Sequence, residues 1–242
     1  MKSVVLLHLL VLGITCGTAW AETPAKRWSN RAEVSFIRTG GNTDVTTLSL
    51  KNLFSYTITD PLSISAKLEA LNSKEGGSQT AERYLAELRV DYLFTQRMYG
   101  IASTAWLRDT FAGIATHYDG NLGGGYKFVD GPRHTLLGEA GATYTYEEYT
   151  NGSTDNYPGA RLFGKYRFAF AEKNAFTQSV EYLQSLDQTS RQVITSETAV
   201  IAALNSIFSL KTSYTLRFHS KPVPADLKKT DTILEMALVA SF

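Results

Sequence analysis

The sequence contains one cysteine, Cys16, and no long apolar run beyond residue 21. A single cysteine excludes an internal disulfide framework and clustered thiol ligands. A membrane-spanning helix needs about 20 consecutive apolar residues, so nothing beyond residue 21 has the pattern of one. The formal net charge is only +1, which argues against nucleic acid as a partner. The three residues before Cys16 do not form a lipobox, so we do not expect lipid attachment there.

The first 21 residues have the layout of a secretory signal peptide. Lys2 precedes an apolar run over residues 4–12, and residues 19–21 form a small-x-small cleavage pattern. These are the charged, apolar and cleavage regions of an export signal. We therefore expect residues 1–21 to be removed and residues 22–242 to form one exported domain.

The rest of the sequence alternates apolar and polar side chains. Residues 84–94, 162–170 and 208–218 place mostly aromatic and aliphatic side chains at even positions and mostly charged or hydroxyl side chains at odd positions. A period of two is that of a β-strand, and tilted membrane-spanning strands need about 9 to 11 residues. Turn residues divide the chain into about twelve such segments. We place them near 28–39, 43–58, 62–72, 80–94, 98–109, 115–128, 134–148, 157–170, 174–186, 191–204, 206–218 and 230–242.

The final segment is the most informative one. Leu234, Met236, Leu238, Ala240 and the terminal Phe242 share one face, which is typical of the closing strand of a bacterial outer-membrane barrel. The sequence thus predicts an all-β fold, a single antiparallel transmembrane β-barrel of about twelve strands. A soluble β-sandwich is the alternative, but sandwich strands average about five or six residues. Aromatic residues near the expected tight turns also favour the barrel: Tyr56, Phe94, Tyr99, Phe128, Phe168, Phe170, Phe176, Phe208 and Phe242.

The connections are expected to alternate between tight and long. Residues 59–61, 95–97, 171–173 and the junction at Asn205 are short, whereas 73–79, 151–156 and 219–229 are longer and polar. Short periplasmic turns and longer external loops are usual in these barrels. Two glycine-containing segments stand out: Gly40-Gly41-Asn42 is a very tight turn where an external loop is expected, and Gly123-Gly124-Gly125 inside a strand indicates a bend or a close approach.

The start of the first two segments resembles a known family. Trp28, the run Ser35-Phe36-Ile37-Arg38-Thr39-Gly40-Gly41-Asn42-Thr43-Asp44 and the run Thr47-Leu48-Ser49-Leu50 are similar to the salt-induced outer-membrane proteins, also called YdiY-like. The resemblance extends to size, export signal and closing aromatic strand. It implies an outer-membrane barrel of unestablished biochemical role and supplies no catalytic residues.

The odd-numbered face carries charges of both signs. We expect these side chains to line the lumen, together with Arg31, Glu33, Lys67, Glu69 and Asp91: Lys51, Arg83, Glu87, Arg89, Glu139, Glu147, Arg161, Lys165, Arg167, Glu181, Glu197, Lys211, Arg217 and Glu235. The basic strand with Arg161 should lie between acidic neighbours, and Lys211 and Arg217 should lie between Glu197 and Glu235. Opposite charges on adjacent strands pair across a sheet.

Two functions fit such a lumen. Paired charges can fill it in a structural or stress-associated envelope protein, which the balanced signs favour. Alternatively, they line a narrow, weakly selective pore for ions or small solutes, because about twelve strands are wider than the eight that side chains fill. Expected partners are outer-membrane lipid, lipopolysaccharide and the assembly machinery, which would read the closing strand and Phe242.

Catalysis is the third possibility, as an outer-membrane lipid hydrolase. His117, Asp119 and Asn121 alternate on one face, but no nucleophile motif accompanies them; His134 lies beside a turn and His219 opens a loop. Asn151, Asp155 and Asn156 with Glu147 and Glu148 form an acidic loop cluster without the spacing of a calcium site, and Lys221, Lys228 and Lys229 make a basic loop. The sequence thus predicts no enzyme, no catalytic or metal-binding residue and no cofactor.

Overall fold

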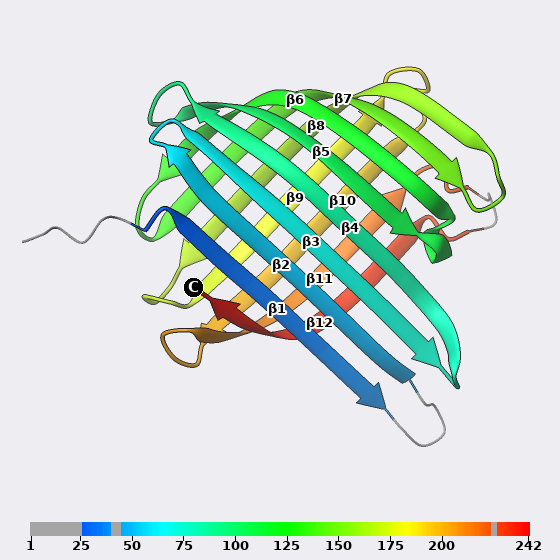
Figure 1. Ribbon diagram of the computed structural model, residues 1–242, viewed down its shortest axis with the longest axis horizontal. Coiled ribbons are helices and arrows are strands. Elements are labelled where there is room, and N and C mark those ends of the chain that lie inside the picture. The colour runs from blue at the N-terminus through cyan, green and yellow to red at the C-terminus, as the bar shows by residue number, and fades with distance from the viewer. Residues whose placement is uncertain (1–25, 40–44, 224–226) are drawn as a thin grey trace, which may run out of the picture.

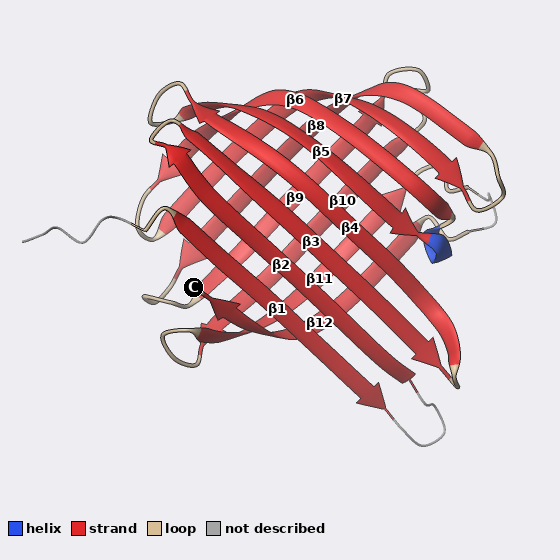
Figure 2. Cartoon of the chain, in the orientation of Figure 1, coloured by secondary structure: helices blue, strands red, loops and turns tan. Residues whose placement is uncertain are grey.

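The computed structural model describes residues 26–39, 45–223 and 227–242. Those residues form a closed antiparallel barrel in which each strand pairs with its chain neighbours and β1 pairs with β12. Figure 1 shows the strands wrapping round one lumen, and Figure 2 shows that the secondary structure is nearly all strand apart from one short 3-10 helix. The described residues contain no helix long and apolar enough to cross a membrane.

The strand bounds agree closely with the expected segments. They are β1 Trp28–Thr39, β2 Val45–Thr59, β3 Leu62–Glu75, β4 Ser78–Leu93, β5 Met98–Asp109, β6 Ile114–Asp130, β7 His134–Tyr149, β8 Thr154–Ala169, β9 Ala175–Ser185, β10 Gln192–Ala203, β11 Phe208–His219 and β12 Thr230–Ser241, with the 3-10 helix η1 at Thr110–Ala112. We call the end that carries the start of β1 and the end of β12 the terminal end (left in Figure 1), and the opposite end the loop end.

Alternation separates an apolar outer face from a polar inner face. On β12, Leu234, Met236 and Leu238 point outward with 66%, 59% and 46% of their surface exposed, whereas Glu235 and Val239 point inward with 6% and 1%. An exposed apolar surface of this extent is unfavourable in water but matches lipid. The outer face is therefore the membrane-facing one.

One connection differs from its prediction, and another is displaced. The expected loop over residues 73–79 is wrong: β3 continues to Glu75, β4 begins at Ser78, and Gly76 and Gly77 alone make the turn with positive φ. The strands continue because alternation persists in polar residues and Gly-Gly supplies the turn that a hairpin requires. The connection expected at 151–156 spans residues 150–153 instead. The predicted turn Gly40-Gly41-Asn42 lies outside the described residues.

The glycine run inside β6 allows a close approach, as expected. A Cβ on Gly125 would lie 2.3 Å from the ring of Tyr99, and one on Gly123 would lie 2.4 Å from the carbonyl oxygen of Ala140. Tyr99 thereby lies flat against β6 and points inward with 6% of its surface exposed. Tyr99 lies next to a tight turn, as expected, but its odd position in the strand turns it to the lumen, unlike the other aromatic residues expected near the turns, which are at even positions.

Gly125→Ala is expected to destabilise the folded barrel, because the new methyl group overlaps the Tyr99 ring and forces it out of place; overpacking of this kind costs about 1 to 3 kcal/mol. The midpoint of urea unfolding in detergent micelles measures the effect. Gly164→Ala on β8 is the matched control, since nothing lies within 4 Å of its Cβ position. Equal midpoints for the two variants would contradict the close approach.

Candidate functional site: the charged lumen

The lumen contains a cavity of about 440 Å³ lined by inward-facing side chains of β2 to β12. It extends from the loop end, where Asp109, His219 and Asp231 line it, to mid-barrel, where Arg89 and Arg161 do. Nearer the terminal end, small and apolar side chains pack the inner wall: Ile101, Ala175, Ala199 and Val239 are each no more than 3% exposed. The lumen is therefore open and polar toward the loop end and more tightly packed toward the terminal end.

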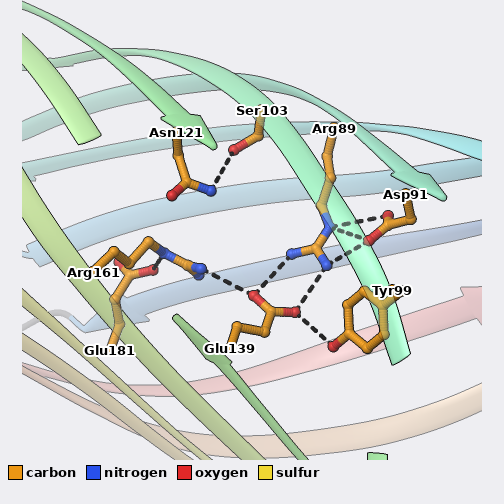
Figure 3. A network of polar contacts seen from close by, with 8 residues as sticks. All are labelled: Arg89, Asp91, Tyr99, Ser103, Asn121, Glu139, Arg161 and Glu181. Atoms are coloured by element: carbon orange, nitrogen blue, oxygen red, sulfur yellow. Dashed lines mark hydrogen bonds and ion pairs between the residues drawn. The ribbon is translucent and has the colours of Figure 1, made fainter. Parts of the chain in front are cut away.

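Glu139 of β7 is the centre of a polar network at mid-barrel (Figure 3). Arg89 of β4 donates to both of its carboxylate oxygens, at 3.1 and 2.8 Å, and Arg161 of β8 donates at 2.9 Å. Tyr99 donates a further bond of 3.0 Å. Glu139 is only 6% exposed, and such burial is tolerated because charged donors satisfy both oxygens.

The network extends to further acids on either side. Arg89 also binds Asp91, at 2.6 to 3.0 Å, and Arg161 binds Glu181 of β9 at 2.7 Å. The Arg89–Glu139 pair joins β4 to β7 across the two intervening strands β5 and β6. The pairs therefore tie the wall together through the lumen as well as along the sheet.

Two further ion pairs cross the seam that closes the barrel. Lys51 of β2 binds Glu235 of β12 at 2.5 Å, and Lys211 of β11 binds Glu33 of β1 at 3.1 Å. β1 and β12 share four register pairs, whereas β1 and β2 share twelve. The seam has few backbone contacts, so these two buried pairs add attraction where the ladder is short.

A third group of polar side chains surrounds the mouth at the loop end. His117 Nδ1 lies 2.9 Å from Glu147 Oε1, and Tyr149 donates to the other oxygen of Glu147. Arg191, in the connection before β10, binds Asp155 at 2.6 Å. Burial, the largest single effect, opposes the charge of Arg191, but the hydrogen bond and charge of Asp155 together with Tyr149 and Tyr157 outweigh it and raise the pKa of the guanidinium above its ordinary value.

The structure places the expected lumen charges on the inner face. Those that line the cavity are Lys51, Arg83, Glu87, Arg89, Glu147, Arg161, Glu181, Glu197 and Arg217. Glu139, Glu235 and Lys211 take part in the buried pairs above, and Lys165 and Arg167 share the face of Arg161 on β8. Lys211 and Arg217 lie on β11 between the strands that carry Glu197 and Glu235, as expected. Lys211 binds Glu197 and also Glu33, whereas Glu235 binds Lys51.

Several inner-face residues were missed. Asp109 pairs with Arg83 at 3.1 Å, and Asp155, Arg191 and Asp231 line or flank the mouth. They lie at strand ends, where the alternating pattern gives way to turn residues. The one signal in the sequence that could have revealed them is that their positions are odd-numbered, like those of the other inner-face residues.

No histidine in the described part of the chain is hydrogen-bonded through its ring to a serine hydroxyl. His117 binds Glu147 inside the lumen, away from the lipid-facing surface, and no described serine hydroxyl hydrogen-bonds to it. His219 is half-buried and lines the cavity, so its expected position in an exposed loop is wrong: β11 continues to include it. Glu147 and Glu148 lie on opposite faces, so the acidic loop cluster does not converge. The described ranges hold no group of three or more His, Cys, Asp or Glu residues placed to bind a metal.

A family model described as "Protein of unknown function, DUF481" matches residues 32–242. The chain belongs to this family. It is also 27% identical over 169 residues to a protein of Escherichia coli (strain K12), described as "Uncharacterized protein YdiY", a match that covers 70% of this chain and 66% of that relative. The match thus spans just under two thirds of the relative's length. The YdiY-like resemblance is confirmed, and it brings no established activity to this DUF481 member.

Three solved structures share the fold. An outer-membrane channel from Pseudomonas putida F1 matches with a TM-score of 0.54 at 11% identity, covering 93% of this chain and 98% of that one. The translocator domain of the autotransporter NalP from Neisseria meningitidis matches with a TM-score of 0.52 at 10% identity, and the match covers 91% of this chain and 90% of that one. The NanC porin matches with a TM-score of 0.50 at 9% identity, and the match covers 88% of this chain and 97% of that one. At these identities the likeness is one of fold: the DUF481 chain has the fold of outer-membrane β-barrels, as predicted.

Proposed function

We propose that this protein spans the bacterial outer membrane and forms a narrow, weakly selective passage for ions and small hydrophilic solutes. The observation that carries the proposal is the cavity of about 440 Å³ inside a closed barrel. A lumen filled with side chains would leave no such space. Its wall bears both signs of charge, and their pairing leaves a small net field, so discrimination between ions is weak.

A structural role in the envelope, such as one under salt stress, is the second candidate. The Arg89–Glu139–Arg161 network favours it, because bonds that join β4 to β7 and β8 through the lumen stiffen the wall and occupy part of the lumen. In that role the same ion pairs hold the wall together, and no ions or solutes pass through the barrel. The balance between the two functions therefore depends on whether solute passes this network.

The proposed location explains the two ends of the chain. The terminal end faces the periplasm, because an export signal over residues 1–21 would deliver the chain there and the connections at that end are short. The loop end then faces outward, where its polar connections contact lipopolysaccharide. Outer-membrane lipid covers the apolar outer face.

In planar lipid bilayers the refolded protein is expected to give discrete current steps that are smaller than those of general porins, because its barrel has fewer strands than their 16 to 18. Selectivity between potassium and chloride should be weak. A control without protein excludes detergent artefacts. A protein that folds, judged by a mobility shift without boiling, yet stays silent at all voltages and salt concentrations would support the structural role.

A further inference from the structure

Two basic side chains of the lumen, Lys165 and Arg167 of β8, have no partner among residues 26–39, 45–223 and 227–242. Both lie on the same inner face as Arg161, nearer the terminal end of the barrel. Among the described residues neither makes a hydrogen bond or an ion pair, in contrast to Arg161, which makes two. Lys165 is exposed and Arg167 is half-buried, so water in the lumen reaches both.

The register of the sheet explains why no acid compensates them. Lys165 lies opposite Leu137 of β7 and Ser179 of β9, and Arg167 lies opposite Thr135 and Thr177. Directly opposite residues are the ones that pair across strands. All four are neutral, so the adjacent wall supplies no carboxylate to either cation.

The nearest acids on the adjacent strands are already engaged. Glu139 and Glu181 lie one inward-facing step closer to the loop end, both opposite Phe163. Arg161 binds them at 2.9 and 2.7 Å, and Arg89 takes the remaining acceptor capacity of Glu139. Neither of these two acids is therefore left to pair with Lys165 or Arg167.

Charges of both signs on other strands act on Lys165. Of the four side-chain charges that act most strongly on Lys165, three are the cations Arg31, Lys211 and Lys67, and one is the acid Glu197. Glu197 itself binds Lys211 at 3.1 Å. Arg31 binds Glu33 at 3.1 Å and Lys67 binds Glu69 at 2.9 Å, so these cations are paired as well. Among the described side chains, the unpaired positive charge in this part of the lumen is that of Lys165 and Arg167.

We propose that Lys165 and Arg167, with the hydroxyls of Thr135, Thr177 and Ser179, form a binding site for small oxyanions such as phosphate or a carboxylate. The guanidinium binds two oxygens side by side, the ammonium contributes a mobile point charge, and the hydroxyls donate hydrogen bonds. The two Cα atoms are about 7 Å apart along the strand, a span that these long side chains close round one anion.

A role of this site in transport rests on the proposed passage, but anion binding itself can be tested in a barrel that does not conduct. Inorganic phosphate should raise the thermal unfolding midpoint of the detergent-folded barrel in a saturable way, relative to sodium chloride at equal ionic strength. Lys165→Ala/Arg167→Ala should lose this rise, whereas the charge-conserving Lys165→Arg/Arg167→Lys should retain most of it. Arg133→Ala/Lys173→Ala, two exposed cations in terminal-end turns, is the matched control and should behave as wild type.

Ion selectivity gives the second measurement. In a potassium chloride gradient the zero-current potential of the wild type should have the sign that indicates a preference for chloride. The Lys165→Glu/Arg167→Glu variant should shift this potential to the sign that indicates a preference for potassium. If phosphate does not raise the unfolding midpoint, or raises it equally in the wild type and the double alanine variant, the proposed anion site is wrong. That result would not contradict the proposed passage, which conductance tests separately. Stabilisation that needs both cations, in a barrel that never conducts, would support the site and overturn the passage.

Discussion

Glu139→Ala is expected to lower the free energy of unfolding by about 3 kcal/mol, the lower end of the range for breaking a buried ion pair. The variant leaves Arg89 and Arg161 facing each other without the carboxylate that joins them. The lower end applies because the two guanidinium side chains are 22% and 14% exposed and water in the lumen screens them. Urea unfolding in micelles, followed by tryptophan fluorescence, measures the loss.

Glu148→Ala is the matched control for this change. Glu148 is on the same strand, is exposed, and lies on the opposite face, so its removal should alter stability by no more than about 0.5 kcal/mol. Glu139→Gln keeps the shape of the side chain and removes its charge, and it should fall between the two. If Glu139→Ala and Glu148→Ala unfold at the same urea concentration, Glu139 is not the centre of the lumen network.

Phe242→Ala is expected to reduce the amount of folded protein in the outer membrane several-fold. Phe242 exchanges two backbone hydrogen bonds with Asn30, at 2.9 and 3.2 Å, at the end of a seam that has only four register pairs. Its side chain is 52% exposed and so is available to the assembly machinery that we propose reads the closing strand. The measurement is the heat-dependent mobility of the protein in isolated outer membranes.

Phe208→Ala separates this role from a general need for interfacial aromatics. Phe208 lies on β11, opposite Ala240, and is 39% exposed, but it is not terminal. We expect that variant to reach the membrane normally and Phe242→Ala to refold in detergent, where no machinery acts. Equal outer-membrane levels of the two variants would count against a terminal assembly signal.

The period of two was enough to predict the barrel and the direction of most charges. It fixed which face each strand residue occupies, and Glu139, Arg161 and Glu181 follow from neighbouring strands. Tyr99 lies near a tight turn, as predicted, and its odd position directs it to the lumen, whereas the other aromatic residues named near the turns are at even positions. The loop at 73–79 was misjudged because polar residues suggest a loop, although these strands continue beyond the apolar band.

The seam pairs were not predictable from neighbouring segments. Lys211 and Glu33 are 178 residues apart in the sequence, and Lys51 and Glu235 are 184 apart. Only closure of the barrel, which brings β1 beside β12, makes them neighbours. The free cations Lys165 and Arg167 likewise needed the register, since their lack of partners depends on which residues lie opposite.

Single-cysteine labelling tests the central claim most directly, because Cys16 is the only cysteine in the sequence. With Cys16 replaced by serine, cysteines at Ser179 and Val180 of β9 occupy the cavity wall and the 43%-exposed outer face, respectively. In lipid vesicles a water-soluble thiol reagent should modify position 179, and brominated lipid should quench a fluorophore attached at position 180. Labelling of both positions by the water-soluble reagent, with no quenching at either, would contradict a sealed barrel with water inside and lipid outside.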